Sequence, residues 1–186
     1  MASSYLTNHF LIAMPGMEDP NFAQTVTLVC EHSERGALGI VINRPLEMSL
    51  GDVFSQLGLD ASQSRVTAQH VRHGGPVQTD RGFLLHTPGP AWESTLAVSE
   101  RLHLTTSRDI LDALAAGRGP EQVVIALGYA GWEAGQLEDE MAQNAWLTSP
   151  AEERLLFDVP AEERWHAACR LLGIDLLHLS SDAGHA

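Results

Sequence analysis

The first 45 residues consist of short apolar runs separated by turn residues, a pattern that predicts β-strands. Residues 10–13 form the first run, which Pro15 and Gly16 end. Residues 25–30 alternate between apolar and polar, whereas residues 38–43 are apolar at nearly every position and so suit burial on both faces. The polar stretch between these two runs has the glycine and the length of a hairpin loop. We therefore expect one strand followed by a hairpin.

Helix signals begin after the hairpin. Ser49 and Asp52 have the spacing of a capping box, and Gly58 suits the end of that short helix. Ser107 is predicted to cap a second helix that ends at Gly117. The rest of the pattern predicts a polar loop at 60–69, strands at 70–73, 82–86, 96–98, 122–127 and 155–157, a glycine turn at 128–132, helices at about 133–142 and 160–172, and a disordered tail at about 180–186.

This order of elements indicates the fold class. Hairpins that precede alternating helices and strands are typical of one α/β or α+β domain. We expect a mixed, mostly antiparallel sheet with an N-terminal hairpin and helices packed on it. No long linker divides the chain, so residues 1–186 are predicted to form a single domain.

The charge of the chain excludes several functions. Lys and Arg total 11 against 24 acidic residues, which gives a net charge of −13, and every basic residue is an arginine. A Schiff-base lysine and a phosphate-loop lysine are thereby excluded. An acidic chain repels polyanions, so we expect no direct binding to nucleic acid and none to an anionic membrane. The first residues lack the features of a signal peptide, and the expected location is the cytoplasm.

The cysteines and histidines do not form a metal-binding pattern. Cys30 lies in a predicted strand and Cys169 in a predicted helix, and both are expected to be buried thiols rather than a disulfide. His70 and His73 are three positions apart on a predicted strand, so their side chains would point to opposite faces. We expect neither a metal nor another cofactor.

Several blocks along the chain carry a resemblance to a known family. They are FLIAMPGM at 10–17, PNF at 20–22, CEHS at 30–33, GALGIVINRP at 36–45, HGGP at 73–76, GWEAGQLE at 131–138 and NAW at 144–146. With these blocks in this order, the chain resembles the YqgE/AlgH family from about residue 5 to 175. The resemblance implies a bacterial protein with a compact α/β fold, in a family often described as transcriptional regulators. It implies no particular reaction, substrate or cofactor.

Asn43 and Arg44 form the first candidate site, at the end of the predicted hairpin and near the loop at 20–22. The planar guanidinium of arginine suits a carboxylate or a phosphate group. It equally suits a structural role, in which it would bind the carbonyl groups of the loop. The sequence leaves both interpretations open.

The glycine turn at 128–132 and the helix after it form the second candidate site. The glycine spacing does not match a dinucleotide-binding loop. Polar residues recur at helical spacing on one face of the helix, and acidic residues gather in its C-terminal half, where the helix dipole opposes them. This face either is exposed to solvent or lines a pocket. The polar face consists of Glu133, Gln136, Glu140 and Asn144, and the acidic residues of the C-terminal half are Glu138, Asp139 and Glu140. The family resemblance falls on Gln136, Glu138, Asn144 and Trp146.

Three functions remain open. The first is a non-enzymatic binding or regulatory protein that acts on gene expression indirectly, through a small acidic ligand or a protein segment. Its predicted groove contains Asn43, Arg44, Gly74, Gly75, Gln136, Glu138, Asn144 and Trp146. The alternative is an enzyme in which His32 or His86 acts with Glu138 or Glu140 as an acid–base pair. Direct DNA recognition is the third, which the family description suggests and the net charge opposes. The sequence does not determine the ligand or the oligomeric state.

Overall fold

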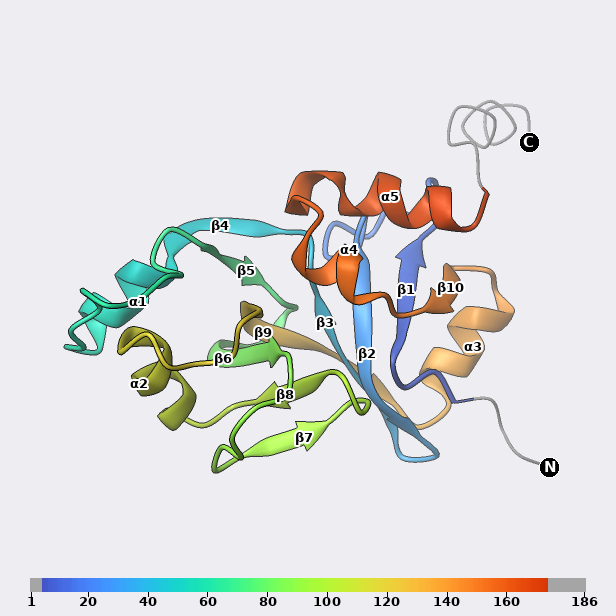
Figure 1. Ribbon diagram of the computed structural model, residues 1–186. Coiled ribbons are helices and arrows are strands. Elements are labelled where there is room, and N and C mark those ends of the chain that lie inside the picture. The colour runs from blue at the N-terminus through green and yellow to red at the C-terminus, as the bar shows by residue number, and fades with distance from the viewer. Residues whose placement is uncertain (1–4, 174–186) are drawn as a thin grey trace.

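The early apolar runs lie side by side as antiparallel strands, as their pattern predicts. A computed structural model describes residues 5–173 of the chain (Figure 1). The strands are β1 (His9–Ala13), β2 (Val26–Ser33), β3 (Gly36–Val41), β4 (Pro45–Ser49), β5 (His70–His73), β6 (Val77–His86), β7 (Thr95–Ala97), β8 (His103–Thr105), β9 (Val123–Glu133) and β10 (Trp146–Pro150). The helices are α1 (Leu50–Gln56), α2 (Asp109–Ala115), α3 (Gln136–Ala142), α4 (Glu153–Phe157) and α5 (Arg164–Leu171), with a 3-10 turn η1 (Ala161–Glu163) before α5.

The long strand β9 connects the two halves of the sheet. The strand order is β10-β1-β2-β3-β9-β6-β8-β7. The second half of β9 pairs with β3, while its first half pairs antiparallel with β6 and parallel with β5, which in turn pairs with β4. The result is a single α+β domain on a curled, mostly antiparallel sheet, which confirms the predicted fold class.

Helices cover both faces of this sheet (Figure 1). Along β1, Phe10 and Ile12 pack in the core that contains Trp165 of α5, whereas Leu11 and Ala13 pack in the core under α3. A third core lies under α1 and α2, against β5, β6 and β9. Because successive strand residues point to opposite faces, a continuous apolar run such as 10–13 suits a strand covered on both sides.

Several local predictions are confirmed. The hairpin joins β2 and β3 through Glu34 and Arg35, with Ser33 paired to Gly36. Helix α1 begins with the predicted capping box, in which Ser49 and Asp52 exchange side-chain and backbone hydrogen bonds. Cys30 and Cys169 are buried free thiols.

Other local predictions are wrong. Residues 155–157 lie in α4 and not in a strand, because the acidic helix-start sequence before them begins a helix that buries Leu155 and Leu156. Ser107 does not cap α2, since its hydroxyl binds the Asp109 side chain and the backbone of Ser94 instead. Leu171, an apolar residue at the end of the helix predicted at 160–172, is exposed. The strands β4, β8 and β10 were not predicted, and the predicted tail at 180–186 lies outside the described residues.

The predicted glycine turn at 128–132 is also wrong, because β9 continues through it to Glu133. Gly128 has φ +81° and lies where the pairing of β9 with β6 changes register. A Cβ atom there would come within 2.4 Å of the Gly75 carbonyl oxygen. The glycine therefore serves close strand packing at an irregular position, not a turn.

Candidate functional site

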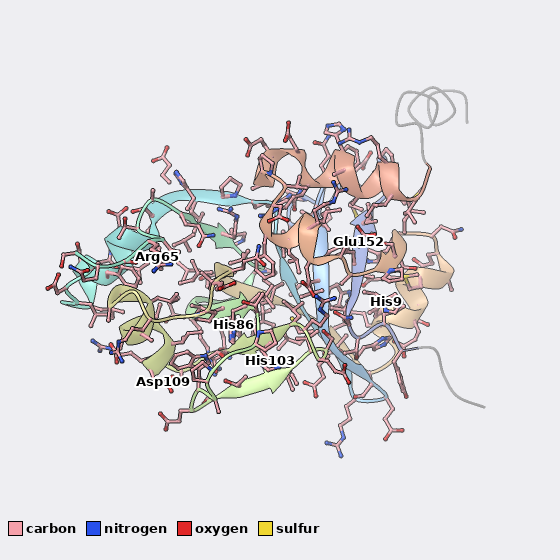
Figure 2. The ribbon with its side chains drawn as sticks, viewed as in Figure 1. His9, Arg65, His86, His103, Asp109 and Glu152 are labelled. Atoms are coloured by element: carbon pink, nitrogen blue, oxygen red, sulfur yellow. The ribbon has the colours of Figure 1, made fainter. Side chains whose placement is uncertain are left out.

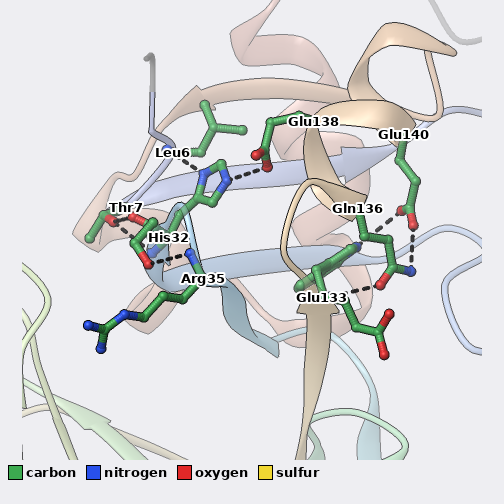
Figure 3. Close-up of polar contacts among 10 residues, drawn as sticks. Leu6, Thr7, His32, Arg35, Glu133, Gln136, Glu138 and Glu140 are labelled. Carbon is green, nitrogen blue, oxygen red and sulfur yellow. Dashed lines mark hydrogen bonds and ion pairs between the residues drawn. The ribbon is translucent and has the colours of Figure 1, made fainter. Parts of the chain in front are cut away.

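Glu140 on α3 holds two tryptophans from two strands. Its Oε1 accepts hydrogen bonds from Nε1 of Trp132 at 3.1 Å and of Trp146 at 3.0 Å. Its Oε2 accepts a bond from Gln136 at 3.0 Å, and Gln136 Oε1 accepts one from the backbone of Glu133 (Figure 3). The polar face predicted on this helix is thus a hydrogen-bonded network that ties α3 to β9 and β10.

The helix begins later than predicted, which reverses its electrostatics. Gly135, with φ +80°, precedes the helix, so Glu138 and Asp139 lie in its first turn. Negative charge at a helix N-terminus is favourable, whereas the sequence had suggested charges that oppose the dipole. Asn144 lies just beyond the helix end with φ +59°, a conformation that asparagine tolerates.

His32 and Glu138 form the histidine–carboxylate pair that the enzyme alternative requires. His32 Nε2 lies 2.7 Å from Glu138 Oε1, and the two residues are 106 positions apart in the sequence. The backbone N–H of Leu6 donates to Nδ1 at 2.9 Å, so Nδ1 must be an acceptor and Nε2 carries the proton (Figure 3). Both ring nitrogens of this buried histidine are therefore occupied. The pair fastens residues 5–7 to the hairpin and to α3.

His86 is fully buried on β6, far in the fold from α3. Its Nδ1 donates to the Thr87 carbonyl oxygen at 2.9 Å, and Nε2 lies 2.7 Å from the Thr105 hydroxyl. His103 lies beside His86 (Figure 2). Burial lowers the pKa of His86 below its usual value, and the charge of His103 acts in the same direction. This arrangement keeps a neutral histidine inside the sheet.

Asn43 and Arg44 clamp the loop between β1 and β2. Arg44 donates to the carbonyl oxygens of Asn21 at 2.8 Å and Ala23 at 3.0 Å. Asn43 accepts from the backbone of Val26 and donates to the carbonyl of Gln24. These contacts agree with the structural interpretation, in which Arg44 binds the carbonyl groups of the loop.

The clamped loop carries Phe22 into the tryptophan cluster. The Phe22 ring lies 5.4 Å from the ring of Trp146 and 6.1 Å from that of Trp132, centroid to centroid. The Arg44 clamp and the Glu140 network thus support one aromatic cluster from two sides.

Gly74 and Gly75 allow close approach to β9. A Cβ atom on Gly74 would come within 2.3 Å of the Gly128 oxygen, and one on Gly75 within 2.1 Å of the Tyr129 backbone. Both positions are therefore restricted to glycine by packing.

The structure distributes the residues of the predicted groove over three places. Asn43 and Arg44 line a cavity of about 220 Å³ with Trp165 and His166, which Gly75 and Glu138 do not line. Gly74 and Gly75 lie against β9, and Glu138 faces His32. A ligand-binding role for these eight residues stays a prediction.

A larger cavity opens beside the hairpin end and is called the hairpin cavity here. It has a volume of about 590 Å³ and combines exposed charged side chains with the edges of two aromatic residues. Its lining consists of Glu31, Ser33, Arg35, Gly36, Ala37, Leu38, Val77, Tyr129, Gly131, Trp132 and Glu133. Three segments that are distant in the sequence meet at this cavity.

Two buried arginines were not predicted from the sequence. Arg72 on β5 is 8% exposed and Arg164 at the start of α5 is 3% exposed. Burial lowers the pKa of both, and that of Arg164 falls to about 10, partly because Arg72 lies near it. A signal was present for Arg164, which shares a helix face with the apolar Ala168. Nothing in the sequence pattern set Arg72 apart.

Residues 5–173 contain no group of three or more histidine, cysteine, aspartate or glutamate side chains placed to hold a metal ion. Among the helices in that range, none is long and apolar enough to cross a membrane.

The fold and these contacts define a single-domain α+β protein with a curled sheet, in which Glu140 of α3 is hydrogen-bonded to two tryptophans of the sheet. Comparison with known proteins identifies the family: the chain belongs to the AlgH-like family (DUF179), which it matches over residues 10–177. It is 57% identical over 185 residues to the UPF0301 protein Tgr7_2910 of Thioalkalivibrio sulfidiphilus, covering 100% of this chain and 99% of that protein. It is also 57% identical over 184 residues to the UPF0301 protein PA14_05290 of Pseudomonas aeruginosa, covering 98% and 97%.

Two solved structures are similar to this chain. The solution structure of the AlgH protein from Pseudomonas aeruginosa gives a TM-score of 0.79 at 56% identity and covers 100% of this chain and 98% of that one. The crystal structure of protein DIP2367 from Corynebacterium diphtheriae gives a TM-score of 0.74 at 20% identity, covering 97% and 94%, and shares the fold.

Proposed function

We propose that this protein is a non-enzymatic binding protein that acts in the cytoplasm on gene expression, indirectly, by holding a segment of a partner protein at the hairpin cavity. The observation that carries the proposal is the meeting of three chain segments there. The hairpin supplies 31–38, β9 supplies 129–133, and Val77 follows the glycine pair at 74–75.

The cavity is built on rigid elements. Gly36 pairs with Glu133 and Ala37 with Trp132, so the floor consists of paired β-strands. Trp132 is held from behind by Glu140. A preformed site of this kind loses little conformational freedom when it binds.

The lining suits a protein segment of mixed charge. Arg35 offers a cation, Glu31 and Glu133 offer anions, and Tyr129 offers an amphipathic ring. Arginine and aromatic side chains are frequent energetic centres of protein interfaces. A volume of about 590 Å³ accommodates a few side chains of a partner, and a small acidic ligand paired with Arg35 is the competing occupant.

Charge reversals at the cavity test the proposal. Arg35→Glu and Glu133→Arg change exposed side chains and leave the strand pairing intact. Arg101→Glu, an exposed arginine near α4, is the matched control. Each variant is used as bait in bacterial extract, and any protein retained is then titrated as a purified pair by calorimetry. We expect the two cavity variants to bind at least tenfold more weakly than wild type and control. Equal binding by all variants contradicts the proposal.

The enzyme alternative has one observation in its favour, the 2.7 Å contact between His32 and Glu138. Against it, His32 Nδ1 already accepts from Leu6, and neither residue lines the hairpin cavity. An enzyme that used this pair would lose its activity in Glu138→Gln, whereas the proposed binding would persist.

Direct DNA binding is tested by a gel shift at low salt. We expect no saturable complex, because the net charge of the chain is −13.

A further inference from the structure

Within residues 5–173, Arg72 and Arg164 are buried cations without a carboxylate partner. The ion pairs of the described residues involve His32, Arg101 and Arg108, so neither buried arginine has an acidic oxygen within 4.0 Å in that part of the chain. Buried charges in proteins are normally paired, because desolvation of an isolated ion is costly. Two of them close together in a protein of net charge −13 require an explanation.

The hydrogen bonds of the two guanidinium groups differ. Arg164 donates from Nε to the Val159 carbonyl at 2.9 Å and from Nη1 to the Ile42 carbonyl, which fixes its position between α5 and β3. Arg72 donates from Nη1 to the His70 carbonyl at 2.6 Å, while its Nε is buried and has no acceptor among the described residues. Arg164 thus has a structural role, and Arg72 has an unused donor.

Arg72 lines a cavity of about 620 Å³, called the arginine cavity here. Its lining comes from β4, from residues 68–69 and β5, and from residues 160–162. His70 lies two positions before Arg72 on the same strand, so it shares that face and also lines the cavity. The site is separate from the hairpin cavity, and the two share no lining residue.

Glu47 and Glu162 are the acidic residues in the lining of the cavity, and Glu162 acts electrostatically on both arginines. It is exposed on η1, lines the arginine cavity, and raises the pKa of both Arg72 and Arg164 through its negative charge. It nevertheless stays outside ion-pair distance of either guanidinium. The positive charge of the two arginines is therefore left without a carboxylate within ion-pair distance among the described residues.

We propose that the arginine cavity binds a small oxyanion, the phosphate or carboxylate group of a small molecule, with Arg72 as the principal contact. The anion binds the guanidinium of Arg72 at the cavity and offsets part of the positive charge of the two arginines. A water molecule could accept a hydrogen bond from Arg72 but would not offset the positive charge of the two arginines. The net charge of −13 repels polyanions, so the ligand is a small anion rather than nucleic acid.

Nuclear magnetic resonance of the full chain tests this directly. Sodium phosphate and sodium acetate are titrated separately at constant ionic strength, with the arginine Nε–H signals recorded beside the backbone amides. We expect a saturable shift of the Arg72 Nε–H signal and of amides at 45–47, 69–72 and 160–162. The anion that saturates first identifies the phosphate or the carboxylate as the recognised group.

Three variants make the result specific. Arg72→Gln should raise the dissociation constant at least about tenfold, the equivalent of one charge-assisted hydrogen bond. Glu162→Gln should lower it, because the internal competitor is removed. Arg101→Gln removes the same charge at an exposed position and should leave it unchanged.

The proposal is overturned if neither anion gives a saturable shift, or if Arg72→Gln titrates as wild type does. Should Arg72→Gln fail to fold, Glu162→Gln decides: tighter binding supports the site, and unchanged or weaker binding overturns it. Because the hairpin cavity has its own variants, failure of either proposal leaves the other standing.

Discussion

Removal of the Glu140 carboxylate tests whether the tryptophan cluster is a structural unit. In Glu140→Leu, the indole N–H groups of Trp132 and Trp146 lose their common acceptor, and both tryptophans are buried. Each buried polar group left without a partner costs about 1–3 kcal/mol. Glu140 itself is only half-buried, so water relieves part of the penalty. We expect the free energy of unfolding to fall by about 2–4 kcal/mol.

Glu140→Gln is the conservative companion. The amide oxygen can still accept from both indoles, but the amide NH₂ then faces the NH₂ of Gln136. Gln136 cannot turn its own amide without losing the bond from the backbone of Glu133, which is 2.9 Å long. We expect this variant to lose about 1 kcal/mol.

Urea unfolding followed by circular dichroism measures both variants against wild type. A loss below about 0.5 kcal/mol for Glu140→Leu would refute the reasoning, because surface substitutions commonly reach that value. The same substitution in the double variant Trp132→Phe with Trp146→Phe separates the loss of the indole acceptor from other effects of Glu140→Leu. There the Glu140→Leu penalty should become much smaller, since no indole N–H remains to lose its acceptor.

Three further predictions concern the clamp, the glycine contact and the buried histidine. Arg44→Ala frees the loop that carries Phe22, and should cost about 1–3 kcal/mol in urea unfolding and speed amide exchange at 21–25. Gly75→Ala places a Cβ atom 2.1 Å from the β9 backbone and should cost about 3 kcal/mol or more in thermal unfolding, whereas Gly89→Ala, with open space, should be neutral. Burial lowers the pKa of His86 below its usual 6.5 in the folded protein, so on acidification the unfolded chain binds a proton at His86 before the folded chain does. The free energy of unfolding should therefore fall as the pH drops below about 6.5. His86→Gln should reduce this dependence on pH in unfolding measured from pH 7.5 to 5.5.

Short-range signals account for what was predicted well. The capping box of α1 involves residues three positions apart, and the hairpin of β2 and β3 closes through two residues. The errors arose where distant contacts decide the conformation. Gly128 looked like a turn residue, but the approach of the 74–75 backbone makes it part of a continuous strand.

The candidate sites show the same division. Asn43 and Arg44 could be singled out from their residue types and position, yet whether they bind a ligand or loop carbonyls depended on where residues 21–24 lie. That Arg72 Nε lacks an acceptor within residues 5–173 could not be foreseen, because this depends on every neighbouring element.

The sequence by itself determined the acidic charge, the absence of lysine chemistry, the fold class, most of the strands and the start of α1. These follow from composition and from hydrophobic periods of two to four residues, which act locally. The tertiary structure decided the pairing of His32 with Glu138, 106 positions away, and of Arg164 with Ile42, 122 positions away. Hydrogen bonds and ion pairs act over a few ångströms of space, and only the folded chain determines which groups come within that distance.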